Sequence, residues 1–150
     1  MKKVMFIGPI GCGKTTLTQR LQGLALNYDK TQAVAFYPDM IDTPGEYMLH
    51  RQYYSALSVT AAEADVVALM QSVSDEEQLF APGFGGIFNK PIIGIVSKSD
   101  EATSSAQIEQ LQQRLREAGA QQLFCLSAVD ETGIAQLLSY LKEEEDETLH

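Results

Sequence analysis

The stretch that decides the fold is "FIGPIGCGKTT", residues 6–16, close to the start of the chain. Residues 8–15, "GPIGCGKT", fit the phosphate-loop pattern G-x-x-x-x-G-K-[ST] in full. An apolar run precedes this loop and a helix-like pattern follows it, which is the context that the motif requires. Glycines let the backbone curl so that successive N–H groups point at phosphate oxygens, and the following helix turns its positive dipole end toward the same anion. We therefore expect a nucleotide's phosphates here rather than an ordinary tight turn.

Two side chains of this loop have expected roles. Lys14 reaches the β- and γ-phosphates and neutralises part of their charge, and the Thr15 hydroxyl binds Mg²⁺. We count Lys14 among the catalytic residues for this reason. The other nucleotide-binding positions expected in and beside the loop are Gly8, Gly11, Cys12, Gly13 and Thr16.

Length, composition and charge limit the class of protein. The chain has 150 residues, and we expect one domain over residues 1–142 with an acidic tail at 143–150. It is 45% hydrophobic without an apolar run of about 18 residues, and "MKKVMFIG" is too short before the loop to form a signal peptide, so we expect a cytoplasmic protein without membrane insertion. The net charge of −9 argues against binding nucleic acid through bulk charge. Cys12 and Cys125 suit a reduced compartment, where structural disulfides are rare.

The apolar pattern predicts alternating strands and helices. Strand-like runs recur at residues 3–7, 33–37, 65–70, 91–96 and 122–126. Helix-like stripes lie at residues 108–118, after a capping box of Ser104 and Gln107, and at residues 134–141, after the N-cap candidate Asp130. Continuous apolar strands that alternate with amphipathic helices indicate a mainly parallel sheet covered on both faces. The predicted fold class is therefore α/β, with the doubly wound, three-layer architecture of a P-loop NTPase.

A magnesium site needs a carboxylate at the end of a neighbouring strand. "MIDTPGE", residues 40–46, supplies Asp42, and the N–H of Gly45 is placed to meet a γ-phosphate. Thr31 lies in the loop after the first helix, where its hydroxyl would cap Mg²⁺ in the triphosphate state. If Thr31 and Asp42 touch the same ion, the chain between them must run out and back, as a short hairpin with its turn at residues 38–39 allows. The expected metal ligands are Thr15, Thr31 and Asp42.

The segment "IVSKSD", residues 95–100, is expected to bind the base. Asp100 accepts two hydrogen bonds from a guanine edge, whereas adenine lacks both donors and would leave the carboxylate unpaired, at a cost of about 1–3 kcal/mol. The stem of Lys98 lies over the base, and Ser127 and Ala128 follow the last strand, with the Ala128 N–H offered to the guanine oxygen. A solvated turn is the alternative interpretation of "SKSD", but its position after a buried strand argues against that.

Taken in order, "GPIGCGKT", Thr31, "DTPG", "SKSD" and "SA" resemble the motif series of the Ras-like GTPase superfamily. More narrowly, the chain is similar to the EutP/PduV family of ethanolamine- and propanediol-utilisation proteins. The closer match lies in "KTQA", "IDTPGEY", "YYSAL", "EADV" and "PGFGGIFNKPIIGIVSKSD", at residues 30–33, 41–47, 53–57, 63–66 and 82–100. The likeness covers nearly the whole chain apart from the acidic tail, and it does not separate the EutP branch from the PduV branch.

The resemblance implies a compact Ras-like G domain that binds GTP or GDP with Mg²⁺ and accompanies a bacterial microcompartment, whose shell or enzymes would be its partner. Acetate kinase activity has also been assigned to EutP members, so phosphoryl transfer between nucleotide and acetate stays an alternative, as does a non-catalytic assembly module. Many relatives carry a glutamine that orients the attacking water, and this chain has Glu46 there. A carboxylate beside the γ-phosphate favours slow hydrolysis. The expected catalytic residues are Lys14, Thr31 and Glu46.

Two other features carry structural expectations. "FAPGFGGIF", residues 80–88, has too much glycine and proline for a long helix, and its phenylalanines either fold down on the sheet or form an exposed patch for a partner. We favour the first interpretation. Cys125 is expected to lie in the core, in a buried strand.

Overall fold

The computed structural model describes residues 2–9, 16–17, 19–21, 40–42, 51–73, 80–127 and 133–147. The strands in this part of the chain are β1 (Val4–Ile7), β2 (Met40–Asp42), β3 (Val66–Ser72), β4 (Ile92–Ser97) and β5 (Gln122–Cys125). The longer helices are α2 (Tyr54–Ala61), α3 (Ser105–Ala118) and α4 (Ile134–Glu147). Short 3₁₀ helices occur at Arg51–Tyr53, Phe84–Ile87 and Ser99–Glu101, and residues 16–17 and 19–21 are also helical.

The described strands form one parallel sheet in the order β2-β1-β3-β4-β5. β3 lies in its centre, paired with β1 as far as the Ile7–Leu69 pair and with β4 as far as the Ser72–Ser97 pair. Every residue of β1, β3 and β4 is buried, as expected when helices cover both faces of a parallel sheet. The predicted α/β fold is confirmed.

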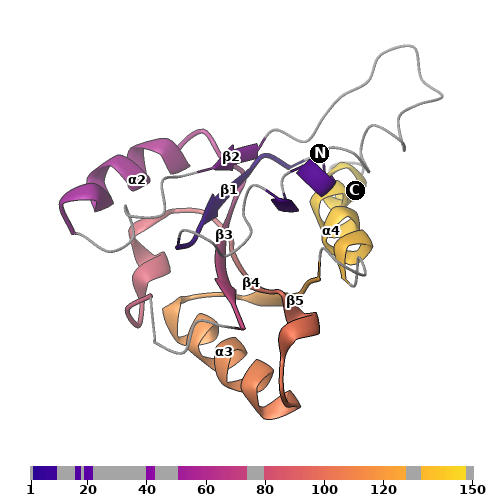
Figure 1. Cartoon of the computed structure of the whole chain (residues 1–150). Coiled ribbons are helices and arrows are strands. Elements are labelled where there is room, and N and C mark those ends of the chain that lie inside the picture. The colour runs from indigo at the N-terminus through magenta and orange to yellow at the C-terminus, as the bar shows by residue number, and fades with distance from the viewer. Residues whose placement is uncertain are drawn as a thin grey trace.

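Helices on the two faces of the sheet complete three layers (Figure 1). Leu57 of α2 and Leu115 of α3 belong to the core on one face of the sheet. The core on the other face contains Leu21, from the helical residues 19–21, and Leu137 of α4. Successive residues of β3 alternate between these two cores, because side chains along a strand point to opposite faces. The loops that follow the strands therefore leave from one edge of a sheet that is buried on both sides.

The helical stripes seen in the sequence face the sheet, as predicted. The buried positions of α3 are Leu111, Leu115 and Ala118, and those of α4 include Ile134, Leu137 and Leu141. α4 continues to Glu147, so residues 143–147, which we expected in the acidic tail, belong to this helix. None of the described helices is long and apolar enough to cross a membrane.

The N-terminus of α3 departs slightly from the predicted capping box. The Ser104 side chain accepts a hydrogen bond from the Gln107 backbone N–H (3.3 Å), as predicted. The Gln107 Oε1 accepts in return from the backbone N–H of Thr103 (2.8 Å), one residue before the N-cap, and from the Thr103 hydroxyl (3.2 Å). A full capping box would have the Gln107 side chain accept from the backbone N–H of Ser104, and this part of the prediction was wrong. The glutamine side chain is long enough to reach Thr103, the preceding residue.

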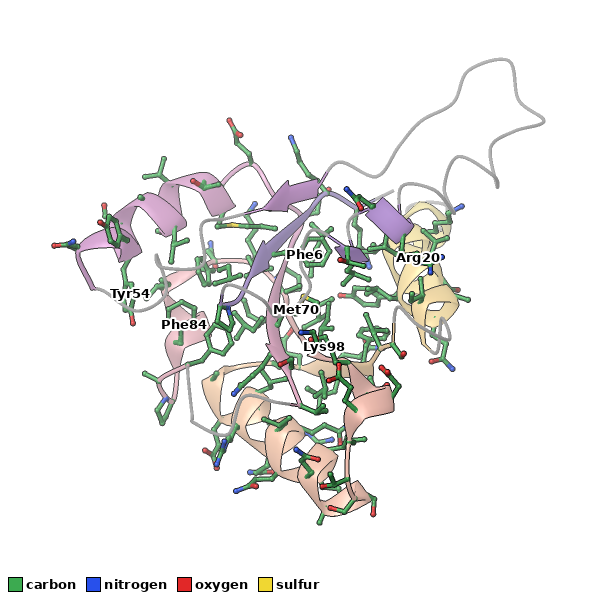
Figure 2. The ribbon with its side chains drawn as sticks, in the orientation of Figure 1. Phe6, Arg20, Tyr54, Met70, Phe84 and Lys98 are labelled. Atoms are coloured by element: carbon green, nitrogen blue, oxygen red, sulfur yellow. The ribbon has the colours of Figure 1, made fainter. Side chains whose placement is uncertain are left out.

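The segment at residues 80–88 folds down on the sheet, which confirms the interpretation that we favoured over an exposed patch. Phe80, Phe84 and Phe88 are buried in the core beneath α2 and α3, with adjacent ring centroids 5.4 and 5.6 Å apart. Tyr54 of α2 contacts Phe84 edge-on at 5.2 Å, so these aromatic rings connect α2 to this segment (Figure 2). Gly85 permits the close packing, since a Cβ there would lie 3.1 Å from the Ala118 carbonyl oxygen.

Three expectations lie outside the described residues. They are the strand-like run at residues 33–37, the hairpin turn at residues 38–39 and the N-cap candidate Asp130. These stay predictions.

Candidate functional site

The buried polar side chains of the described part gather at one edge of the sheet. They are Gln71, Ser72, Ser97 and Ser127. The first three end β3 and β4, and the fourth follows β5 by two residues, so all lie at the carboxyl ends of neighbouring parallel strands. Ligands of open parallel α/β sheets bind outside this edge. Since burying a polar group costs free energy unless it is hydrogen-bonded, this concentration marks the edge as the candidate site.

The chain turns sharply after β4. Lys98 has φ 57° and ψ 38°, and it is the only non-glycine residue with positive φ in the described part of the chain. This left-handed conformation is uncommon outside glycine and is found often at functional sites. The Ser99 N–H donates to the Leu126 carbonyl (3.0 Å), which ties the turn to the end of β5. Ser97, the residue before Lys98, pairs with Ser72 at the end of β3, so the turn lies at the carboxyl end of the sheet, where Figure 2 labels Lys98.

Asp100 and Ser127 are in direct contact at this edge. The Ser127 Oγ donates a hydrogen bond to the Asp100 Oδ1 at 2.8 Å. Ser127 is fully buried, whereas Asp100 is exposed. The serine thus holds the carboxylate in a fixed orientation while leaving it accessible. An accessible, oriented carboxylate can accept a pair of N–H donors from a ligand.

The two ends of the predicted phosphate-binding loop are described. Gly8 is buried directly after β1, and Thr16 is exposed in the helical residues that follow the loop. Leu17 and Leu21 anchor that helix in the core that α4 covers. The strand and helix that a phosphate-binding loop requires are therefore both present.

Asp42 lies at the same edge as the start of this loop. It is the last residue of β2 and pairs with Phe6, two residues before Gly8. Carboxylate oxygens are preferred ligands of Mg²⁺, so this position fits the metal ligand expected from the sequence. Among the residues that the structure describes, no group of three or more His, Cys, Asp or Glu side chains is placed to hold a metal ion.

Other predicted site residues lie outside the part of the chain that the structure describes. They are Gly11, Cys12, Gly13, Lys14, Thr15, Thr31, Gly45, Glu46 and Ala128. Their roles stay predictions. Of the predicted set, the structure brings together Lys98, Asp100 and Ser127 at one edge, with Gly8 and Asp42 ending neighbouring strands of the same sheet.

Sequence reasoning missed the buried side chains of Gln71 and Ser72. Both end the run "DVVALMQS" of β3, where apolar residues give way to polar ones. The change from apolar to polar residues within one buried strand is the sequence signal from which Gln71 and Ser72 could have been predicted. An amide or hydroxyl is retained inside a core where it has hydrogen-bonding partners.

Cys125 corrects an expectation away from the site. It is half-buried rather than core, because β5 is an edge strand of the described sheet. Burial raises the pKa of its thiol, and the hydrogen bond from the Gln112 Nε2 to the Sγ (3.1 Å) acts in the opposite direction. The thiol is therefore the favoured form.

The comparisons with known proteins agree with this geometry. A family model described as ethanolamine utilisation – propanediol utilisation (PduV-EutP) matches residues 1–143. The chain is 46% identical over 149 residues to the propanediol utilization protein PduV of Citrobacter freundii, covering 99% of each chain. It is 35% identical over 158 residues to a protein of Escherichia coli K12 named "Probable acetate kinase EutP", covering 100% of this chain and 98% of that one.

A solved structure shares the fold. It is translation elongation factor SelB from Methanococcus maripaludis, in complex with the GTP analogue GppNHp. The TM-score is 0.65 at 20% identity, and the match covers 93% of this chain and 32% of that one. The present chain thus spans about a third of the length of SelB, and the likeness shows that the two share a fold.

Proposed function

This chain belongs to the PduV-EutP family of ethanolamine and propanediol utilisation, and on that premise we propose that it binds GTP through a phosphate-binding loop and hydrolyses it slowly. The observation that carries the proposal is the Asp100 carboxylate, held by the buried Ser127 hydroxyl at the edge of the sheet where this loop begins. Nucleotide specificity and phosphate binding would then both be located at one edge.

Most of the residues that we expect to contact the base lie in the described part of the chain. Guanine offers an N1–H and a 2-amino group side by side, and Asp100 accepts from both. Adenine lacks these donors and would leave the carboxylate unpaired, which costs about 1–3 kcal/mol. The half-buried Lys98 lies two residues away, and its aliphatic stem covers the base. These contacts favour GTP and GDP over adenine nucleotides.

The phosphates are bound by the loop after β1. Gly8 begins this loop, Lys14 contacts the β- and γ-phosphates, and the loop's N–H groups surround the phosphate oxygens. When bound, Mg²⁺ neutralises charge that develops on the phosphate oxygens. Asp42 and the hydroxyls of Thr15 and Thr31 would hold the ion, since these are the oxygen ligands that magnesium prefers.

Slow turnover follows from the residue after "DTPG". Glu46 takes the position from which a glutamine orients the attacking water in many Ras-like GTPases. As a carboxylate, Glu46 repels the γ-phosphate, and as an acceptor it can still orient water. The chain therefore binds GTP and turns it over slowly until a partner moves Glu46.

The family supports a metabolic setting for the proposed activity. Its members are described by ethanolamine and propanediol utilisation, and we propose that the present chain is a cytoplasmic protein associated with a bacterial microcompartment. Its partner would be a shell protein or an enzyme of that compartment. Co-purification from cells grown on either substrate tests this part separately from nucleotide binding.

Acetate kinase is the second candidate, and the name of the EutP relative is the observation that favours it. Such an enzyme passes phosphate between a nucleotide and acetate. It needs cationic groups or N–H donors that hold the acceptor carboxylate beside the γ-phosphate. Lys30 and Arg51 are the candidates that the sequence offers for that role.

One experiment separates these functions. Purified protein is incubated with Mg–GTP or Mg–ATP, with and without acetate, and free phosphate and acetyl phosphate are both measured. We expect free phosphate from GTP, at a rate that acetate leaves unchanged. Acetyl phosphate formation would contradict the GTPase proposal in favour of the kinase, and tight GTP binding without either product would favour an assembly module.

A further inference from the structure

Gln71 is a buried polar residue near the carboxyl end of β3, in the core that α2 and α3 cover. Its side chain is 1% exposed at the end of β3, after the apolar run 66–70. Because side chains alternate along a strand, Gln71 shares the face of Leu69 and Val73, in the core beneath α2 and α3. Ser72 and its paired neighbour Ser97 share the opposite face. The amide of Gln71 therefore lies on the opposite face of β3 from Ser72, among mainly apolar side chains.

Gln71 lies where β1 and β3 separate. The pairing of these strands ends at Ile7 and Leu69, whereas β3 stays paired with β4 through Gln71 and beyond. After Ile7 the chain leaves the sheet as Gly8 and Pro9, the first residues of the phosphate-binding loop. Counting on by two residues in both strands puts Gln71 level with Pro9. The amide is thus next to the point at which this loop departs.

A buried amide requires hydrogen bonds, because burying it unpaired costs free energy. Within the described part of the chain, every buried side-chain nitrogen and oxygen has a hydrogen-bonding partner. On the face of Gln71, Val73 and Val96 are apolar, and the nearby Gln107 side chain is engaged with the backbone of Thr103 and Val73. The main-chain groups of Gly8 and Pro9, which follow the last β1–β3 pair on the strand beside Gln71, are polar groups that this amide can bond.

We propose that Gln71 is a positioning residue for the phosphate-binding loop: its buried amide hydrogen-bonds the first residues of the loop and fixes the direction in which the loop leaves β1. The inference rests on the proposed nucleotide binding. A loop held in this way loses less conformational freedom when the nucleotide binds, so more of the interaction free energy is realised as affinity. Gln71 acts through the loop and not on the base, so it sets affinity for phosphates without changing the choice of base.

The test replaces the amide while keeping the length of the side chain. Gln71→Met does this at the proposed position. Gln112→Met is the matched control, since Gln112 of α3 donates to the Sγ of Cys125 on β5, which is separated from β1 by β3 and β4. Gln71→Asn keeps an amide on a shorter stem and serves as the second variant if Gln71→Met does not fold. Calorimetry gives the Kd of Mg–GTP, Mg–GDP and Mg–ATP, and thermal unfolding gives the stability of each nucleotide-free protein.

We expect Gln71→Met to raise the Kd of GTP and GDP by about tenfold or more, with the ratio of GTP to ATP affinity unchanged. Its unfolding temperature should fall only modestly, because an apolar side chain in an apolar core partly offsets the lost hydrogen bonds. Gln112→Met should bind as the wild type does, and Gln71→Asn should fall between the wild type and Gln71→Met. Wild-type affinity in folded Gln71→Met, whatever its unfolding temperature, would overturn the inference alone. Absence of nucleotide binding by the wild type would overturn the proposed function and this inference together.

Discussion

Ser127 and Asp100, 27 positions apart in the sequence, are joined by a 2.8 Å hydrogen bond in which the buried hydroxyl donates to the exposed carboxylate. The bond connects the turn after β4 to the end of β5. A second connection, from the Ser99 N–H to the Leu126 carbonyl, runs parallel to it. Two loops are thereby held as one unit, and an acceptor in that unit can discriminate between bases because it does not move away from a mismatched ligand.

Asp100→Asn is expected to change the preferred base from guanine to xanthine. Xanthine has a carbonyl where guanine has its amine, and the asparagine amide can donate to that carbonyl. Competition of GTP, XTP and ATP for the protein measures the change. A variant that still prefers GTP to XTP would show that Asp100 does not contact the base.

Glu46→Gln is expected to keep or slightly improve GTP affinity and to alter hydrolysis. One lost repulsion of about 1 kcal/mol corresponds to roughly fivefold in rate, and the amide can still orient water. Glu46→Ala should lower hydrolysis further while sparing binding, since alanine offers no acceptor. Single-turnover rates of the wild type and both variants are compared. Coincident rates in all three would leave Glu46 without a role in hydrolysis.

Cys125 gives a pH dependence whose sign follows from its raised pKa. Burial raises the pKa of the thiol, so the folded protein holds the thiol proton more tightly than the unfolded chain, whose thiol has its ordinary pKa. The contribution of Cys125 to stability is therefore complete below the pKa of the unfolded thiol and is lost as the pH rises through the folded pKa.

In a Cys12→Ala background we expect alkylation of Cys125 to be slower in the folded than in the unfolded protein at pH 8. Gln112→Met, which removes the bond that favours the thiolate, should move the rate–pH profile to higher pH. Equal folded and unfolded rates would contradict the account of the thiol.

Phe84→Ala should destabilise the fold by about 3–5 kcal/mol, because it removes a buried ring that contacts three other aromatic rings. Phe84→Leu should cost less, since most of the volume remains. Val59→Ala is the control: Val59 is 71% exposed on α2, and its loss should change stability by about 0.5 kcal/mol or less. Denaturant unfolding measures all three. A small effect of Phe84→Ala would mean that residues 80–88 add little to the core.

Much of the fold could be predicted because the burial of each strand and helix leaves a pattern in its own contiguous sequence. β1, β3 and β4 are buried on both faces, so their sequences are continuous apolar runs, and α3 shows a helical stripe because only one side packs on the sheet. The strand before the predicted phosphate-binding loop and the helical residues after it could also be predicted, because the glycine motif at residues 8–15 is typical of a strand–loop–helix unit.

Other features depend on contacts between distant residues and had no local signal. That Cys125 is only half-buried follows from the place of β5 at the edge of the sheet, which its own sequence does not specify. The role that we propose for the amide of Gln71 could not be predicted from its own sequence, because it depends on the point at which β1 and β3 separate. Asp100 and Ser127 were both predicted as site residues from their motifs, but the hydrogen bond between them became evident only when β4 was seen to pair with β5.

The central claim, that the chain binds a guanine nucleotide through the loop after β1, is tested most directly by calorimetric titration of Mg–GTP and Mg–ATP into the wild type and Lys14→Ala. We expect the wild type to prefer GTP by about tenfold or more, because adenine would leave the Asp100 carboxylate unpaired. Lys14→Ala should lose triphosphate binding while its circular dichroism and unfolding temperature match the wild type, since the lysine charge serves the phosphates and not the core. Unchanged GTP affinity in folded Lys14→Ala, or equal affinity of the wild type for ATP and GTP, would contradict the claim.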